Sequence, residues 1–259
     1  MISGNSIKHI KSLGSKKKRN IEREFIVEGA KTVAELLRSE MKIKKIYALK
    51  SWIHNNAKKF QGIDIQEIDE NDMQKISVMQ TAPEVLAEVF YKEEKKFQIE
   101  PDKLYLCLDS VQDPGNFGTI LRIANWFGIN TLIASNDCVD FYNSKVVQAS
   151  MGSVFRVDVF YCDLPSTLKK ALEMQLPVYG TFLNGKNIYT EKLSSNGIIV
   201  LGNEGHGILP ETEPFINKKI FIPTGSDART APESLNVSTA AAIVCSEFFR
   251  SCPKKFCQV

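Results

Sequence analysis

The chain has 259 residues, of which 43% are hydrophobic and 24% charged, so it can bury one large core or two modest ones. No apolar run approaches the roughly 18 residues of a membrane-spanning helix, and the N-terminus lacks the apolar stretch of a secretion signal. This composition argues against a membrane or secreted protein, and we expect a cytoplasmic one.

The net charge of +3 is unevenly distributed. Residues 1–59 carry 15 Lys/Arg against 5 Asp/Glu, residues 60–100 carry 4 against 10, and residues 101–259 carry 14 against 15. A basic N-terminal segment suggests a polyanionic partner, although a solvated lysine-rich surface would have the same composition. Within it, a run of four cations resembles a cluster that faces phosphates: Lys16, Lys17, Lys18 and Arg19.

The first part of the chain reads as a small α/β unit. Strands are predicted at residues 25–29, 43–49, 63–68 and 85–91, and helices at residues 30–38, 51–60 and 71–79. Residues 92–101 are charged, poor in core residues and end in proline, which favours a linker. We therefore divide the chain into a domain at residues 1–97, a linker at 98–103 and a second domain at 104–259.

The second part alternates strands with helices. Strands are predicted at residues 104–109, 131–134, 154–160, 178–182, 198–201 and 220–222, and helices at 117–127, 143–149, 165–175 and 235–250. This alternation predicts a parallel sheet with helices on both faces. The six cysteines are scattered without a Cys-x-x-Cys pair or nearby histidines, so we expect reduced thiols and no metal site.

A polar turn follows the first strand of this sheet, where ligands of open α/β sheets gather. Pro114-Gly115 makes the turn, and we expect Asn116 to cap the next helix. Arg122 lies on that helix among apolar residues. An arginine so placed, just after a loop at a strand end, indicates contact with an anion.

Two further turns follow later strands. Gly202-Asn-Glu-Gly-His-Gly207 fits neither a Walker loop nor Gly-x-Gly-x-x-Gly, and it holds the carboxylate of Glu204 in a tight loop. We assign His206 a structural or binding role rather than that of a general base. Before the last helix stand Ser234 and Asn236; a capped helix explains Ser234 but leaves Asn236 unexplained.

These three segments closely resemble the motifs of the SpoU family of RNA ribose 2′-O-methyltransferases. The resemblance covers residues 104–250 and rests on residues 116–122, 202–205 and 234–238. Residues 1–97 resemble, less strongly, the L30e-like RNA-binding domain that often precedes it. The stretch from Ile222 to Leu235 is longer than the family pattern leads us to expect, which puts the position of Ser234 in doubt.

The resemblance implies an α/β fold whose C-terminal part threads a trefoil knot, a rare exception to the rule against knots. It implies a homodimer, a ribosomal RNA substrate, and S-adenosyl-L-methionine bound by residues of the knot loops. The implied cofactor-binding residues are Thr181, Leu183, Gly202, Ile222 and Leu235. The implied catalytic residues are Asn116, Arg122, Glu204, Ser234 and Asn236. On charge alone, we expect residues 16–19 to contact RNA.

Arginine has a pKa above roughly 12 and is a poor base, so we interpret Arg122 as a clamp for phosphate and oxyanion. Three alternatives stay open at this point. The substrate could be a transfer RNA, the chain could be an RNA-binding or ribosome-assembly protein without catalysis, or an enzyme could use another adenine-containing ligand.

Overall fold

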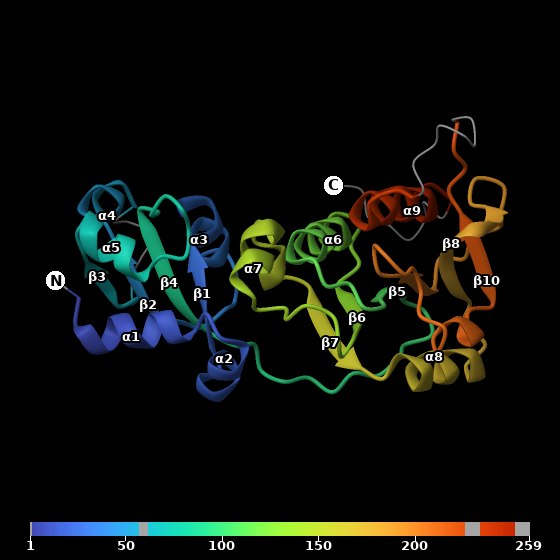
Figure 1. The fold of residues 1–259 in the computed structure, drawn as a ribbon, viewed down its shortest axis with the longest axis horizontal. Coiled ribbons are helices and arrows are strands. Elements are labelled where there is room, and N and C mark those ends of the chain that lie inside the picture. Colours follow the sequence, from blue (N-terminus) through green and yellow to red (C-terminus); the bar gives the residue numbers. More distant parts are fainter. Residues whose placement is uncertain (1, 57–61, 226–233, 252–259) are drawn as a thin grey trace. The chain divides into compact units, whose positions relative to one another are not determined.

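A computed structural model describes residues 2–56, 62–225 and 234–251, drawn as a ribbon in Figure 1. The chain forms two compact units. The first comprises Met1–Lys95 and Asp140–Arg156, and the second comprises Lys96–Val139 and Val157–Val259. None of the helices in the described ranges is long and apolar enough to cross a membrane.

The first unit is built on a four-stranded sheet. Its helices are α1 (Gly4–Ser12), α2 (Lys16–Glu22), α3 (Ala30–Leu36), α4 (Lys50–Asn56), α5 (Glu70–Ile76) and α7 (Ser144–Ser150), with a short 3-10 helix at Ser153–Phe155. Its strands are β1 (Glu24–Glu28), β2 (Ile43–Ala48), β3 (Ile65–Glu67) and β4 (Val85–Phe90). The strand order is β1-β4-β2-β3, in which β4 is antiparallel to both neighbours and β2 is parallel to β3.

Two elements of this unit were not predicted, α1 and α2. Ser3 caps α1 by accepting a hydrogen bond from the Ser6 amide at 3.1 Å, and Ile10 is buried in a core with Met73 and Leu86. The cap and the spacing of Ile7 and Ile10 are visible in the sequence, so they are the signal that could have predicted α1.

Residues 140–156 follow β6 in the chain but belong to the first unit. The predicted domain boundaries, by contrast, placed them in the second domain. Asp140 accepts a hydrogen bond from Arg19 Nε at 3.1 Å, and Tyr142 stacks on Tyr91 with ring centroids 3.9 Å apart. Helix α7 ends where Met151 (φ 48°) and Gly152 (φ 92°) take left-handed conformations. The predicted strand at residues 154–160 is therefore wrong in its first half, because the chain makes a 3-10 turn there before β7 begins.

The second unit is built on a six-stranded sheet. Its strands are β5 (Leu104–Leu108), β6 (Thr131–Ser135), β7 (Asp158–Cys162), β8 (Val178–Asn187), β9 (Gly197–Leu201) and β10 (Lys218–Phe221). Its helices are α6 (Pro114–Trp126), α8 (Leu164–Glu173) and α9 (Val237–Ser251), with a 3-10 helix at Glu213–Phe215. The order is β10-β8-β9-β5-β6-β7 and every pairing is parallel, which confirms the predicted parallel sheet.

Helices cover both faces of this sheet (Figure 1). On one face α8 packs Leu168 against a core that includes Tyr105 and Val200. On the other face α6 contacts α9, and Phe248 of α9 lies edge-on to Tyr179 of β8 at 4.8 Å. Because all strands run the same way, the loops after β5, β8, β9 and β10 emerge at one edge of the sheet.

Candidate active site

Helix α6 presents Asn116 at this edge. Asp113 is the N-cap of the helix, since its Oδ1 accepts a hydrogen bond from the Asn116 amide at 2.7 Å, and Pro114 occupies the first turn. The prediction that Asn116 caps α6 is therefore wrong. Because Asp113 caps the helix instead, the side chain of Asn116 is available for hydrogen bonds to other parts of the site.

Asn116 joins the three predicted turns by two hydrogen bonds. Its Nδ2 donates to Glu204 Oε1 at 2.6 Å, and its Oδ1 accepts from Asn236 Nδ2 at 2.9 Å. The partners lie 88 and 120 residues further along the chain. The structure thus links the side chains of Asn116, Glu204 and Asn236 by two consecutive hydrogen bonds, and we call this set the amide relay.

Asn236 is also the residue that caps α9. Its Oδ1 accepts hydrogen bonds from the amides of Ser238 at 2.9 Å and Thr239 at 3.3 Å. A capped helix therefore does explain Asn236, and the interpretation that Ser234 is the cap is wrong. Ser234 is exposed and makes no hydrogen bond with any residue that the structure describes. It directly follows residues 226–233, which lie outside the described ranges.

The hydrogen bonds that cap α9 determine which atom donates and which accepts at each step of the amide relay. Asn236 turns its oxygen to α9, so only its nitrogen is available to Asn116. An ionised carboxylate can only accept, so Glu204 requires the nitrogen of Asn116 and leaves its oxygen for Asn236. Each amide has one orientation that satisfies both neighbours, and an acid in place of either amide would break the sequence of donors and acceptors.

The loop that carries Glu204 is anchored to the end of β5. Asn203 Nδ2 donates to the Ser110 carbonyl at 2.7 Å, and Asn203 Oδ1 accepts from the Gly205 amide at 2.8 Å. Beyond the loop, Asp109 Oδ2 accepts from the Leu209 amide at 2.9 Å. Asp109 is only 1% exposed, and this burial raises the pKa of its carboxyl above the usual value.

Sequence reasoning missed Asp109 and Asn203 as anchors of the site. The signal for Asp109 is a charged residue that directly follows a continuous apolar strand, where a buried carboxylate needs partners. Asn203 stands beside Glu204 in a glycine-rich loop, and its side chain bonds to backbone two residues ahead, as asparagine commonly does in turns.

Gly202 allows this loop to close. A Cβ atom at Gly202 would lie 2.1 Å from the carbonyl carbon of Gly207 and 2.2 Å from the Ile208 nitrogen, distances that no side chain tolerates. The loop folds back so tightly that Asn203 and Gly207 bond to each other in both directions, at 2.8 and 2.9 Å. Glycine is therefore required at 202 by the backbone itself.

Most of the predicted cofactor-binding residues lie within or directly after neighbouring strands of the sheet. Thr181 lies in β8 and donates to the Val200 carbonyl at 3.4 Å, Gly202 directly follows β9, and Ile222 directly follows β10. Two leucines are exposed, Leu183 by 71% and Leu235 by 46%.

Arg122 lies apart from the amide relay. It is exposed on α6 and makes no hydrogen bond or ion pair with any residue in the described ranges. Asn116, Glu204, Ser234 and Asn236 therefore make no hydrogen bond to Arg122 in the structure. A guanidinium without an internal partner is available to an anion that the protein does not itself supply.

The basic run divides in the structure. Lys16, Lys17 and Lys18 are exposed on α2, whereas Arg19 is 3% exposed. Arg19 Nη1 donates to the carbonyls of Leu13 at 2.8 Å and Gly14 at 2.9 Å, in addition to its ion pair with Asp140. The prediction that Arg19 faces a phosphate is therefore wrong, because internal acceptors already occupy it.

Comparison with known proteins gives matches to both units. Residues 103–246 match the SpoU rRNA Methylase family, and residues 4–87 match the MRM3-like substrate binding domain. The chain is 30% identical over 239 residues to the 23S rRNA (guanosine(2553)-2'-O)-methyltransferase RlmP of Bacillus subtilis, covering 92% of this chain and 93% of that protein.

Two solved structures are similar along nearly the whole chain. A TrmH-family RNA methyltransferase from Porphyromonas gingivalis, described as putative, is 36% identical with a TM-score of 0.85 and covers 96% of this chain and 99% of its own. An AdoMet-bound rRNA methyltransferase from Sinorhizobium meliloti is 26% identical with a TM-score of 0.80, and the alignment covers 96% of each chain.

Proposed function

This chain belongs to the SpoU rRNA Methylase family, and on that basis we propose that it transfers a methyl group from S-adenosyl-L-methionine to a ribose 2′-hydroxyl of ribosomal RNA. The amide relay is the observation that assigns this proposed function to particular residues. It links three segments, far apart in the sequence, at the edge of a parallel sheet where ligands bind.

The cofactor, when bound, supplies an electrophilic methyl group on a sulfonium sulfur. The task of the chain is then to hold the ribose oxygen in line with that methyl, and alignment of this kind contributes several kcal/mol to lowering a barrier. We assign the cofactor to Thr181 of β8, to Gly202 and Ile222, which directly follow β9 and β10, and to Leu183 and Leu235, which would cover its apolar surface.

We assign Arg122 the role of binding the RNA phosphate and the developing oxyanion. Its guanidinium is always charged at neutral pH, is exposed, and has no partner among the described residues, so an incoming phosphate would be its first one. The amide relay would fix the loop of Glu204 and the start of α9 around the substrate. Ser234 stays a predicted member of the site, beside the segment 226–233.

RNA binding is proposed to use the first unit. Lys16, Lys17 and Lys18 form an exposed cationic stretch on α2, and the unit matches a substrate-binding domain. Neutralising phosphates with these lysines would release counterions, so binding should weaken as salt rises. Selection of RNA over DNA would follow from the reaction, because only RNA has the 2′-hydroxyl.

We further propose a cytoplasmic homodimer whose C-terminal part is knotted. A ribosomal RNA substrate favours the cytoplasm, and the described cysteines are all unpaired, as expected in a reducing compartment. Trp126 on α6 is 83% exposed, which is the kind of apolar surface that a second copy would bury. Membership of the SpoU rRNA Methylase family supports the proposal of a knot.

Two experiments test the proposal. Mapping of 2′-O-methyl groups in ribosomal RNA from cells with and without the protein should show one position that loses its methyl group. Unchanged methylation throughout would refute the assignment. For the clamp, Arg122→Lys keeps the charge but cannot form two parallel hydrogen bonds, so turnover should fall sharply while cofactor affinity stays the same. Near-normal turnover would exclude a bidentate role for Arg122.

A further inference from the structure

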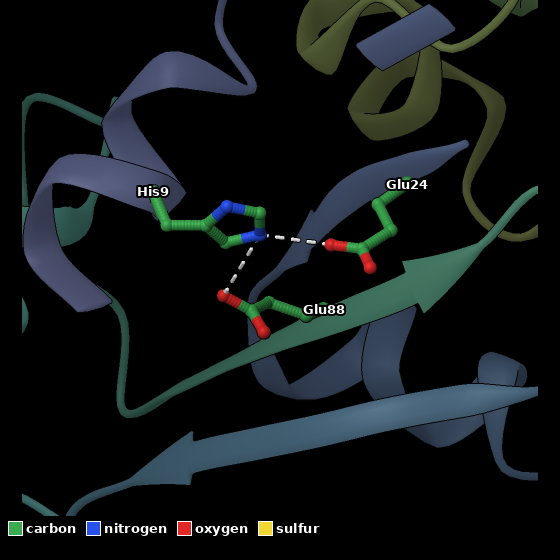
Figure 2. A group of neighbouring side chains, drawn as sticks. All are labelled: His9, Glu24 and Glu88. Atoms are coloured by element: carbon green, nitrogen blue, oxygen red, sulfur yellow. Dashed lines mark hydrogen bonds and ion pairs between the residues drawn. The ribbon is translucent and has the colours of Figure 1, made fainter. Parts of the chain in front are cut away.

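Three side chains of the first unit converge outside the candidate active site (Figure 2). His9 comes from α1, Glu24 from β1 and Glu88 from β4, and both carboxylates point to the same imidazole nitrogen. His9 Nε2 lies 2.8 Å from Glu24 Oε2 and 4.0 Å from Glu88 Oε1. Sequence reasoning did not anticipate this cluster, because its members are separated by 15 and 64 residues and come together only through the antiparallel pairing of β1 with β4.

Burial makes the two carboxylates unusual. Glu24 is 5% exposed and Glu88 is 2% exposed, positions that carboxylates occupy only with partners. Glu24 has them, since Lys44 Nζ lies 2.7 and 2.8 Å from its two oxygens. Glu88 has only long ion pairs, with His9 at 4.0 Å and Lys44 at 3.9 Å, and its buried Oε1 has no hydrogen-bond partner among the described residues.

The donor atoms have the spacing of a metal site. One imidazole nitrogen and two carboxylate oxygens all lie within 4.8 Å of one another. Zinc binds such atoms at about 2.0–2.2 Å in a tetrahedron, which places neighbouring ligands roughly 3.4 Å apart. The observed distances of 2.8 and 4.0 Å from His9 Nε2 fall on either side of that value, so shifts of well under 1 Å would equalise them.

We propose that His9, Glu24 and Glu88 bind a divalent cation of the zinc type, which ties α1 to β1 and β4 and gives the buried oxygen of Glu88 the partner it lacks. The chemistry is that of mixed imidazole and carboxylate ligation, with a fourth position open to water. The expectation from the sequence that the chain has no metal site would then fail for this unit.

Lys44 is the competitor for this position. Its ammonium lies 3.4 Å from His9 Nε2, so it stands where a bound ion would need space. The side chain of Lys44 is 35% exposed and can extend into solvent, whereas the carboxylates cannot. The ion and the ammonium are thus alternatives, and removal of the ammonium should make metal binding tighter.

The test is a Zn²⁺ titration of the full-length chain against a chromophoric competitor, repeated with Co²⁺ to read the coordination from its visible absorption. The wild-type chain should bind one more equivalent than Glu88→Gln or His9→Gln, and Lys44→Met should bind Zn²⁺ more tightly than the wild type. The matched controls are His54→Ala and His206→Ala, which remove the other histidines of the chain and should keep that equivalent.

Equal stoichiometry in the wild type, Glu88→Gln and His9→Gln would overturn the proposal and leave Lys44 as the cation of the cluster. The proposal also fails if Lys44→Met binds Zn²⁺ no more tightly than the wild type. If Glu88→Gln does not fold, the variants at the partly exposed His9 and Lys44 still decide the question. Thermal unfolding of each variant with and without Zn²⁺ reports whether the ion binds the folded state.

Discussion

The amide relay predicts that Asn236→Asp, which replaces one amide nitrogen by oxygen, lowers the rate of methyl transfer. The variant keeps the oxygen that caps α9, and an acid is favourable at a helix N-terminus, so folding should change by less than about 1 kcal/mol. What it loses is the nitrogen that donates to Asn116 Oδ1 at 2.9 Å. An acceptor then faces an acceptor, and Asn116 has no orientation that satisfies both Glu204 and the new acid.

The cost follows from the bonds that are lost. If Asn116 stays in place, one hydrogen bond of about 1 kcal/mol becomes a repulsion between two oxygens. If Asn116 turns round, it gives up its bond to Glu204, which is worth about 1–2 kcal/mol because the acceptor is a carboxylate but the pair is exposed to water. Either path destabilises the arrangement around the substrate by about 1–2 kcal/mol, which corresponds to a fall of roughly 5- to 30-fold in the rate of methyl transfer.

The assay is single-turnover transfer of labelled methyl from S-adenosyl-L-methionine to ribosomal RNA. The matched control is Asn143→Asp, the same change at the N-cap of α7, where Asn143 accepts from the Lys145 amide at 2.9 Å but has no role in the relay. The control should transfer methyl at the wild-type rate. A rate for Asn236→Asp within about threefold of wild type, less than 1 kcal/mol, would refute the idea that the relay positions the site.

Three more predictions follow from the same structure. Gly202→Ala should abolish binding of S-adenosyl-L-methionine in a calorimetric titration, because its Cβ would lie 2.1 Å from backbone, whereas Gly205→Ala, whose nearest neighbour is 3.5 Å away, should bind normally. Replacement of residues 16–18 by glutamine should weaken RNA binding and flatten its dependence on salt without changing cofactor affinity, and an unaltered salt slope would exclude these lysines. Arg19→Ala should leave that slope unchanged but destabilise the chain by about 3–5 kcal/mol, measured by urea unfolding, because it leaves the carboxylate of Asp140, only 13% exposed, without its arginine partner; a midpoint equal to wild type would contradict this.

The sheet of the second unit could be predicted because its central strands, such as β5 and β9, are near-continuous apolar runs bounded by turns. A run such as Leu104–Leu108 is long enough for a strand and too short for a helix. The strand predicted at residues 154–160 went wrong because the same apolar pattern also suits a buried turn. The left-handed backbone at Met151 and Gly152 decided between the two, and periodicity does not detect it.

Charge alone could not predict which residues of α2 are buried and which are exposed. Four consecutive cations look equivalent in the sequence, but a helix turns about 100° per residue, so one member of such a run faces inward. Here Arg19 is that member, and its partner Asp140 lies 121 residues away, beyond the reach of any local pattern. The same limit applies to the cap of α6, where Asp113 and Asn116 are both good capping residues and only the structure separates them.

The convergence of Asn116, Glu204 and Asn236 was expected only through the family resemblance. Local patterns place each of them at a strand end, and parallel strands place those ends on one edge, but the hydrogen bonds that link them depend on side-chain orientation. The same gap explains Arg122, which lies on the predicted helix but outside the relay in the structure. The catalytic and cofactor-binding assignments of these residues stay predictions.

Ribose methylation can be tested most directly by where the methyl group ends up. The purified chain is incubated with ribosomal RNA and S-adenosyl-L-methionine labelled in its methyl group, and the RNA is then hydrolysed in alkali, which cleaves only next to a free 2′-hydroxyl. We predict that the label is recovered in an alkali-resistant dinucleotide. Label recovered in single nucleotides, which would place the methyl on a base, or no transfer at all, would contradict the proposed function.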